Sequence, residues 1–436
     1  MEIAAIVLSL IALVGLIVSS VSNLNVKILN HRIKIYWMFP LLIAIIFIAF
    51  NFISFDDFIS GLFSDSGMNP IKILILFLSM TGLSIFLDEM GLFSFLAYKV
   101  VQKCKASQIK IYFALCALIA ILTMFTSNDI VILTFTPFII FFCKNAKISP
   151  IPYLVSEFVA ANTWSMIFII GNPTNIYLGS YFGVKFVDYF KVMAVPTLCA
   201  GIVEMVILYL IFRKSLKSDF EYSEEETKLN NLPLTIVGVA ILTICTVLLV
   251  VSSYVDFLEM YLVSSISFLT LVIICCIYSL SKKSTPIELG KTFSRLPYEL
   301  IPFLLGMFTI ALCLTHFGVS ASLCDFFGYK NTNLVYGFTS LISCNLVNNI
   351  PMSVLYSEII SNMGSNLTLL PVYSSIAGSN LGAFITPLGA LAGIMWMGIL
   401  SSHNIKYLFK DFIKYGLIIG VPTALVTFLM IPIFVA

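Results

Sequence analysis

Four short polar clusters, two in each half of the chain, hold the residues whose types could bind a small solute. In the first half they span 126–129 (TSND) and 171–175 (GNPTN), and in the second half 348–351 (NNIP) and 378–389 (GSNLGAFITPLG). Such segments cannot face lipid, because their freed backbone groups would lack hydrogen-bond partners there. Paired interruptions of apolar segments in two halves of a chain are typical of the binding site of a secondary transporter.

Amide and hydroxyl side chains dominate these clusters and predict a site for a small, oxygen-rich solute. They supply both donors and acceptors, and a helix that begins at a cluster adds unpaired N–H groups and partial positive charge. Freed carbonyls could hold Na⁺ or another hard cation. The same residue types also cap helices, a role compatible with presenting a site. The candidate substrate-binding residues are Asn128, Asn172, Thr174, Asn175, Asn348, Asn349, Asn380 and Thr386.

Carboxylates inside the apolar segments are the candidates for coupling transport to an ion. Each costs roughly 2.5–3.5 kcal/mol at the centre of a spanning helix, so such a group usually has a function or a partner. We expect Asp129, at a cluster tip, and Glu157, on the helix that enters the next cluster, to couple H⁺ or Na⁺. Glu204 lies in mid-span and could pair with His316 or titrate.

The composition is that of a polytopic membrane protein. Of 436 residues, 60% are hydrophobic and 11% are charged, with a mean hydropathy of +1.04. Soluble domains carry about 25% charged residues. The net charge of +2 gives no reason to expect a nucleic-acid partner. The ten cysteines form no C-x-x-C pair, so neither a disulfide framework nor a metal site is expected, and no cofactor is implied beyond the coupling ion.

The apolar stretches predict the fold class, an all-α polytopic membrane protein with about ten spanning helices and two re-entrant hairpins. Two stretches, 109–143 and 334–361, are long enough to cross twice, but each has a polar tip in its middle and is therefore predicted to be a hairpin. The predicted crossings lie near residues 3–21, 36–53, 70–88, 152–175, 192–213, 233–252, 259–280, 299–318, 370–400 and 412–434.

The distribution of basic residues orients this scheme. With these crossings, 20 of the 24 Lys and Arg residues fall on one side of the membrane, and only Lys72, Lys185, Lys191 and Lys330 fall on the other. The positive-inside rule makes the basic side cytoplasmic. We therefore expect a multi-pass protein of the cytoplasmic (inner) membrane of a prokaryote, surrounded by the lipid bilayer, with both termini outside.

The two halves resemble each other and predict an inverted repeat. Residues 78–91 match 305–318 at an offset of 227, and the hairpin tips align at an offset of 220. Five crossings, an odd number, separate equivalent helices, so the halves have opposite orientations, as in many alternating-access carriers. The predicted domains are a first membrane repeat, 1–215, a cytoplasmic linker, 216–231, and a second, inverted repeat, 232–436.

Several motifs resemble the bacterial arsenite/antimonite efflux permeases (ArsB type), in the superfamily that also holds Na⁺/H⁺ antiporters and divalent anion:Na⁺ symporters. The resemblance is carried by Leu87–Gly91, by Ser127–Asp129 with Thr136-Pro137, by Val347–Pro351, and by 378–389 on to Trp396. It implies metalloid export driven by the proton gradient. It also leaves a homodimer open and, since some relatives dock one, a separate cytoplasmic ATPase partner.

The chain departs from this pattern at its presumed centre. Many arsenite permeases carry Asp where this chain has Asn162 and Asn380, and Lys where it has Phe384. The expected function is secondary active transport of a small oxyanion or metalloid hydroxide, with proton-coupled arsenite/antimonite efflux as the best guess. A Na⁺-coupled, dicarboxylate-like anion symporter, a Na⁺/H⁺ antiporter and an ion channel are the alternatives. No H-E-x-x-H, G-x-S-x-G or Walker A pattern suggests an enzyme.

Overall fold

The computed structural model describes residues 1–21, 25–28, 31–63, 69–104, 107–217, 227–255 and 257–435. The linker predicted at 216–231 therefore lies largely outside the described residues. The elements of the first half are α1 (Glu2–Val21), β1 (Asn25–Ile28), β2 (His31–Lys34), α2 (Met38–Ala49), α3 (Phe55–Leu62), α4 (Pro70–Glu89), α5 (Leu92–Lys103), α6 (Gln108–Phe125), α7 (Asn128–Asn145), α8 (Ile151–Trp164), α9 (Pro173–Tyr181) and α10 (Phe186–Phe212).

The second half repeats this series. Its elements are α11 (Leu232–Ser252), α12 (Met260–Ser281), α13 (Ile287–Arg295), α14 (Leu300–His316), α15 (Val319–Phe327), α16 (Thr332–Val347), α17 (Asn349–Ser361), α18 (Leu370–Gly382), α19 (Leu391–Ser402) and α20 (Phe409–Met430). Gly91 and Gly318 precede α5 and α15 with φ of 78° and 75°, a left-handed conformation that glycine adopts without strain. The same turn thus stands at the same point of both halves.

The predicted all-α class is confirmed, with one small addition. Eight helices of the described residues are long and apolar enough to cross a membrane. The antiparallel pair of β1 and β2 occupies the loop between the first two predicted crossings. Both predicted hairpins form, as α6–α7 and α16–α17. The crossing predicted at 152–175 extends instead to Tyr181, because the helix breaks at Ser165 and resumes as α9.

Local sequence signals begin many of the helices. Asn69 and Asn231 accept hydrogen bonds from backbone N–H groups in the first turns of α4 and α11, and each is followed by a proline within that turn. A proline is tolerated there because its missing N–H would have no partner inside the helix.

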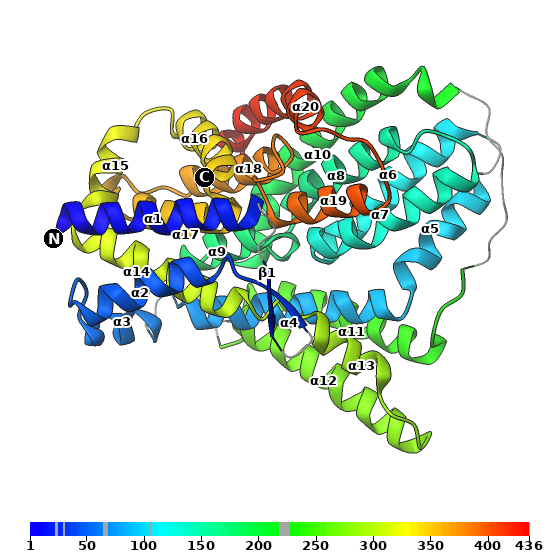
Figure 1. The fold of residues 1–436 in the computed structure, drawn as a ribbon, viewed down its shortest axis with the longest axis horizontal. Helices are drawn as coiled ribbons and strands as arrows, with labels where there is room; N and C mark the ends of the chain where they lie inside the picture. The colour runs from blue at the N-terminus through cyan, green and yellow to red at the C-terminus, as the bar shows by residue number, and fades with distance from the viewer. Residues whose placement is uncertain are drawn as a thin grey trace.

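The helices form two layers (Figure 1). One layer contains α2–α4 and α11–α14, and the other contains both hairpins, both broken helices and the long helices α10 and α20. A small apolar cavity lies between the layers, lined by Ile73 and Phe77 of α4, Leu300 and Leu304 of α14, Pro173 and Tyr177 of α9, and Ile350 of α17. Apolar side chains therefore meet across the layers beside the broken helix.

A carboxylate joins the layers at two places, by hydrogen bonds between side chains. Asp88, at the end of α4, accepts a hydrogen bond of 2.8 Å from Thr134 of α7 and pairs with Arg295 at 2.8 Å. Glu358, in α17, accepts one of 2.9 Å from Thr315 of α14. Asp88 thus has partners in both layers, as a carboxylate within an apolar helix usually does.

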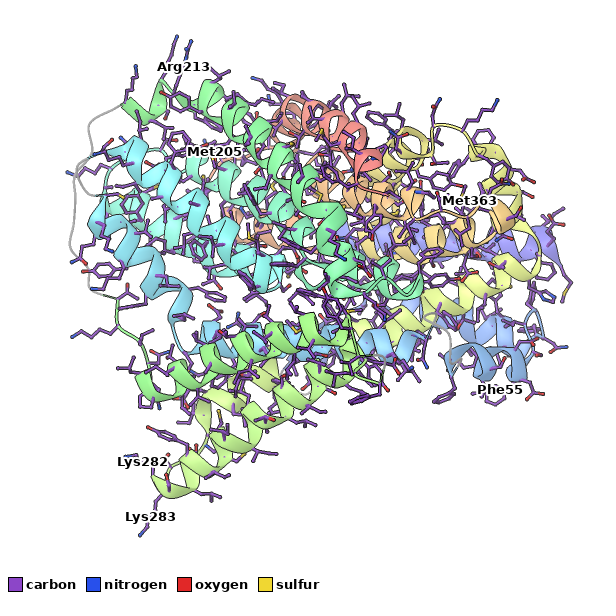
Figure 2. The ribbon with its side chains drawn as sticks, turned by 180° about the vertical axis from the view of Figure 1, so that it is seen from behind. Phe55, Met205, Arg213, Lys282, Lys283 and Met363 are labelled. Carbon is purple, nitrogen blue, oxygen red and sulfur yellow. The ribbon has the colours of Figure 1, made fainter. Side chains whose placement is uncertain are left out.

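The long axis of the molecule separates two ends. Figure 2 shows Arg213, Lys282 and Lys283 at one end and Phe55 and Met363 at the other. The first three belong to the basic side of the predicted topology, and residues 55 and 363 to the opposite side. The arrangement agrees with the separation of charge read from the sequence.

Candidate functional site

Helices begin at both hairpin tips, as the polar clusters predict. α7 begins at Asn128, directly after Ser127. At the other tip Asn348 has φ 74° and ψ 157°, and its side chain accepts a hydrogen bond of 3.4 Å from the N–H of Ile350. This unusual backbone conformation turns the chain sharply from α16 into α17. Asn128, Asn348 and Asn349 are all buried.

The first broken helix exposes backbone groups in the protein interior. After α8, two short 3₁₀ turns (Ser165–Ile167 and Ile169–Gly171) lead to Asn172, whose side chain caps α9 by accepting a 3.0 Å hydrogen bond from the N–H of Thr174. Asn175 donates to the freed carbonyls of Ser165 at 2.8 Å and Phe168 at 3.2 Å. Asn172 thus caps α9 and also lies at the break between α8 and α9.

Asn380, on α18, lies at the centre of the network that joins the two halves. Its Oδ1 accepts hydrogen bonds from Ser165 Oγ at 3.0 Å and from Asn172 Nδ2 at 2.9 Å. Its Nδ2 donates to Asn175 Oδ1 at 2.7 Å. All four side chains are fully buried or nearly so. The two broken helices are therefore held together by neutral amide and hydroxyl groups.

Asn162 extends this network to the first hairpin tip. Its Oδ1 accepts a hydrogen bond of 3.1 Å from Asn128 Nδ2, and its Nδ2 donates to the Phe158 carbonyl four residues earlier at 2.8 Å. Asn380 makes the same bond, at the same 2.8 Å, to the Ile376 carbonyl. Asn162 and Asn380 thus occupy equivalent places in the two repeats. Asn128 Oδ1 is buried and has no hydrogen-bond partner.

Thr174 connects α9 to the second half. Its hydroxyl accepts a hydrogen bond of 3.3 Å from Ser379 and donates one of 3.5 Å to the carbonyl of Asn349. The first break, the second break and the second hairpin tip therefore meet around this side chain.

A second group of contacts holds the break after α18. Asn345 of α16 accepts hydrogen bonds from the Thr386 N–H at 2.9 Å and hydroxyl at 2.7 Å, and donates to the Gly382 carbonyl at 2.9 Å. Asn348 donates to the Leu388 carbonyl at 3.1 Å. Thr386, which is half-buried, thus has a structural partner, Asn345, that was not among the candidate residues.

The predicted coupling residues lie outside the amide network. Asp129 is part-buried in the first turn of α7 and lies near Tyr36. Glu157, fully buried in α8, accepts a hydrogen bond of 2.9 Å from Thr136, and its second oxygen has no partner. Glu204 does not pair with His316, because it faces α8 at Thr163 and Trp164.

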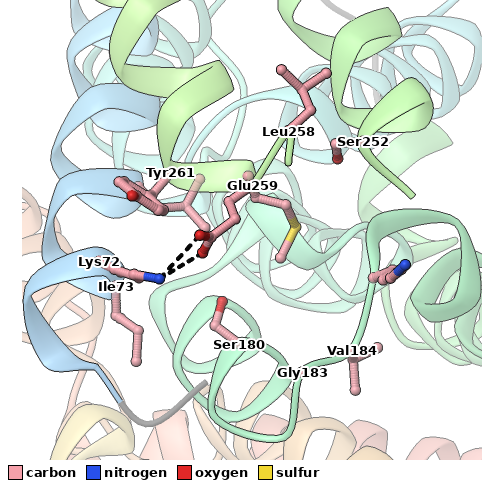
Figure 3. A pocket seen from close by; sticks show the side chains of 12 residues that line it. Lys72, Ile73, Ser180, Gly183, Val184, Ser252, Leu258, Glu259 and Tyr261 are labelled. Atoms are coloured by element: carbon pink, nitrogen blue, oxygen red, sulfur yellow. Dashed lines mark hydrogen bonds and ion pairs between the residues drawn. The ribbon is translucent and has the colours of Figure 1, made fainter. Parts of the chain in front are cut away.

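A separate cavity of about 180 Å³ opens at the far end of α9 (Figure 3). Lys72 and Glu259 form an ion pair of 2.8 Å on its wall, and Ser180, Gly183 and Val184 line the opposite side. α9 has nine residues, about 13 Å at the helical rise, so this cavity is distinct from the amide network at the start of the helix.

Most of the network consists of residues predicted from the sequence, but three of its members were not among the candidates. Asn162 stood out only as a departure from the arsenite-permease pattern, and Ser165 and Asn345 carried no motif signal. Ser165 lies at the end of α8, six residues before the predicted break at 171–175, and Asn345 precedes the hairpin tip by three residues. A polar side chain one helical turn before a cluster was the signal that could have identified Asn345.

The apolar helices, the repeated series and the buried polar centre define a membrane transporter. The chain belongs to the CitMHS family, described as citrate transporters, whose family model matches residues 31–377. The arsenical pump membrane protein of Escherichia coli is 26% identical over 367 residues, which are 80% of this chain and 83% of that protein. A putative arsenical pump membrane protein of Bacillus subtilis is 24% identical over 375 residues, 79% and 83% of the two chains.

A solved structure shares the fold. The YdaH transporter of Alcanivorax borkumensis superposes with a TM-score of 0.56, covering 99% of this chain and 98% of that chain at 11% identity. At this identity the likeness concerns the fold alone. The predicted resemblance to arsenical permeases and the predicted fold are both confirmed.

Proposed function

We propose that the protein exports arsenite or antimonite from the cytoplasm in exchange for protons, by alternating access. The neutrality of the central network is the observation that carries this proposal. Arsenite is an uncharged trihydroxide at pH 7, and amide and hydroxyl side chains can both donate to and accept from its hydroxyl groups. The names of the arsenical pump relatives support the same substrate class.

Asn128 offers the first contact for such a substrate. Its Oδ1 is an acceptor that is buried without a partner, and burying an acceptor unsatisfied costs roughly 1–3 kcal/mol. A substrate hydroxyl that donated to it would remove that cost. Asn172, Asn175 and Asn380 lie in the same network and would hold the remaining hydroxyls.

Transport by purified protein in liposomes tests the proposal. With an acid interior, outward proton flow should drive arsenite accumulation, and a protonophore should collapse it. We propose Asp129 and Glu157 as coupling residues, so Asp129→Asn should lose gradient-driven accumulation. Arsenite flux that merely follows its own gradient, indifferent to pH, would identify a channel. No arsenite movement under either a pH or a Na⁺ gradient would reject the substrate.

Na⁺-coupled transport of a small carboxylate is the second candidate. Helices α7, α9 and α17 begin within the polar clusters. Helix N-termini attract anions. The description of the family as citrate transporters favours the same class. Citrate uptake that requires a Na⁺ gradient and ignores the pH gradient would favour this candidate over arsenite export.

A further inference from the structure

Glu204 is a buried acid to which the proposed transport cycle so far gives no role. It lies in α10 and is 0% exposed, and neither carboxyl oxygen has a hydrogen-bond partner. Among the described residues no ion pair involves it. An ionised carboxylate is very costly in such surroundings, so the group is expected to carry a proton in this conformation.

Two unused donors face this carboxyl group from α8. The hydroxyl of Thr163 and the indole N–H of Trp164 point toward Glu204, and both are buried without partners. The indole packs on Gly201, one turn away on α10, so closely that a Cβ there would come within 2.6 Å of ring atom Cε2, beside the N–H. A small shift would let both donors bond to the ionised carboxylate, which gives the group two states.

A row of polar side chains leads from Glu204 toward the start of α6. Cys116 lies near both Glu204 and Ser156, and the Ser156 hydroxyl bonds to that of Tyr112. The row continues to Tyr153, whose ring meets that of Tyr112 at 5.8 Å and whose hydroxyl donates to Gln108 Oε1 at 3.2 Å. Gln108 begins α6 on the side predicted to be cytoplasmic.

Among the described residues, neither α6 nor α20 brings a basic group to Glu204. From α6 the titratable neighbours are Tyr112 and Cys116. α20 also packs on α10, but its titratable residues lie in its first two turns, where Tyr415 meets Phe212 with ring centroids 5.4 Å apart. Phe212 is eight residues beyond Glu204, about 12 Å along the helix.

The donors that face Glu204 also belong to the segment that holds the amide network. Thr163 directly follows Asn162, which binds Asn128, and Trp164 precedes Ser165, which binds Asn380. A change in how Thr163 and Trp164 meet the carboxyl group would therefore move residues that hold the network.

We propose that Glu204 is a proton-binding residue of the transport cycle, whose charge state is coupled to the amide network through Thr163 and Trp164. This inference rests on the proposed proton-coupled function. A proton is favoured over Na⁺, because an indole N–H can only donate and cannot coordinate a cation.

Infrared difference spectroscopy of the purified full-length protein in lipid tests proton binding without any substrate. Raising the pH should remove a C=O band of a protonated carboxylic acid, and that change should be absent in Glu204→Gln. Trp164→Phe keeps an aromatic ring but removes a donor to the ionised form, so the midpoint of the titration should move to higher pH.

Liposome transport then tests the coupling. In Glu204→Gln, the accumulation of arsenite driven by a pH gradient should fall at least about tenfold. Arsenite exchange should persist, because it requires no net proton movement. Retained exchange shows that the variant is folded, and Glu2→Gln, on the exposed start of α1, is the control.

An unchanged infrared band and unchanged accumulation in Glu204→Gln would overturn the inference. If Glu204→Gln cannot be purified, a titration midpoint in Trp164→Phe equal to that of the wild-type protein would overturn the inference. If the wild-type protein moves no arsenite, the proposed function fails, whereas the infrared titration still decides whether Glu204 binds a proton.

Discussion

At the scale of single residues, the site is built from groups that satisfy one another. Asn380 uses both ends of its amide group to join three side chains of the first half, Ser165, Asn172 and Asn175. Removing one member of such a network leaves its buried partners unsatisfied, which costs more than the net value of the bond itself.

Asn380→Ala should therefore impair both stability and transport. We expect a loss of about 1–3 kcal/mol in the free energy of unfolding and a strong loss of arsenite accumulation. Asn380→Asp should also lose stability, because it keeps the acceptor for Ser165 and Asn172 but removes the donor to Asn175 and to the Ile376 carbonyl. Thermal unfolding in detergent measures the first effect and liposome transport the second, with exposed Asn366→Ala as the control. Full activity in Asn380→Ala would contradict the central place given to this network.

At the scale of elements, small residues let the broken helix α18 approach α16. A Cβ on Gly378 would lie 2.1 Å from both the Gly337 carbonyl oxygen and Ser340 Oγ, and one on Gly382 would lie 2.7 Å from the Leu341 carbonyl oxygen. Backbones that approach this closely are typical of helix pairs in membranes, where small residues make the contact. The position of Asn380, between these glycines, depends on that approach.

Gly378→Ala should push the two helices apart. Overpacking costs about 1–3 kcal/mol, so the unfolding temperature should fall and transport should fall with it. Gly398→Ala, in α19, is the matched control, because no atom lies within 4 Å of a Cβ there. That variant should be neutral or slightly more stable, since alanine favours a helix by about 1 kcal/mol over glycine. Equal effects of the two substitutions would mean that the close approach is unimportant.

At the scale of the whole molecule, two layers meet along apolar side chains, with carboxylates bonding across at Asp88 and Glu358. The layers contain matching elements of both repeats, and Arg213, Lys282 and Lys283 lie at one end of the long axis (Figure 2). An apolar seam has few directional bonds to break, which would suit a shift of the two layers in the alternating access that we propose.

Epitope tags can establish which end faces the cytoplasm. A tag inserted after Lys283 should bind antibody only after spheroplasts are permeabilised, because the positive-inside rule places that loop inside. A tag inserted after Gly364 should bind in intact spheroplasts. The opposite pattern would invert the predicted topology, and the same pattern at both tags would change the predicted number of crossings.

The sequence by itself determined the class of protein, the hairpins and the polar clusters that interrupt the apolar segments. These follow from local properties: apolar length sets the number of crossings, and polar or turn-forming residues within an apolar stretch must be buried in protein. Asn172 and Asn348 were identifiable because each also caps the helix that it precedes.

Only the tertiary structure decided which polar groups meet. Nothing local indicates that Ser165 would contact Asn380, 215 residues away, or that Asn345 would hold Thr386. Glu204 likewise could not be paired from sequence, because its neighbours come from α6 and α8 and are chosen by helix packing. Such contacts depend on how three or more helices are arranged in space, whereas periodicity and capping report on one helix at a time.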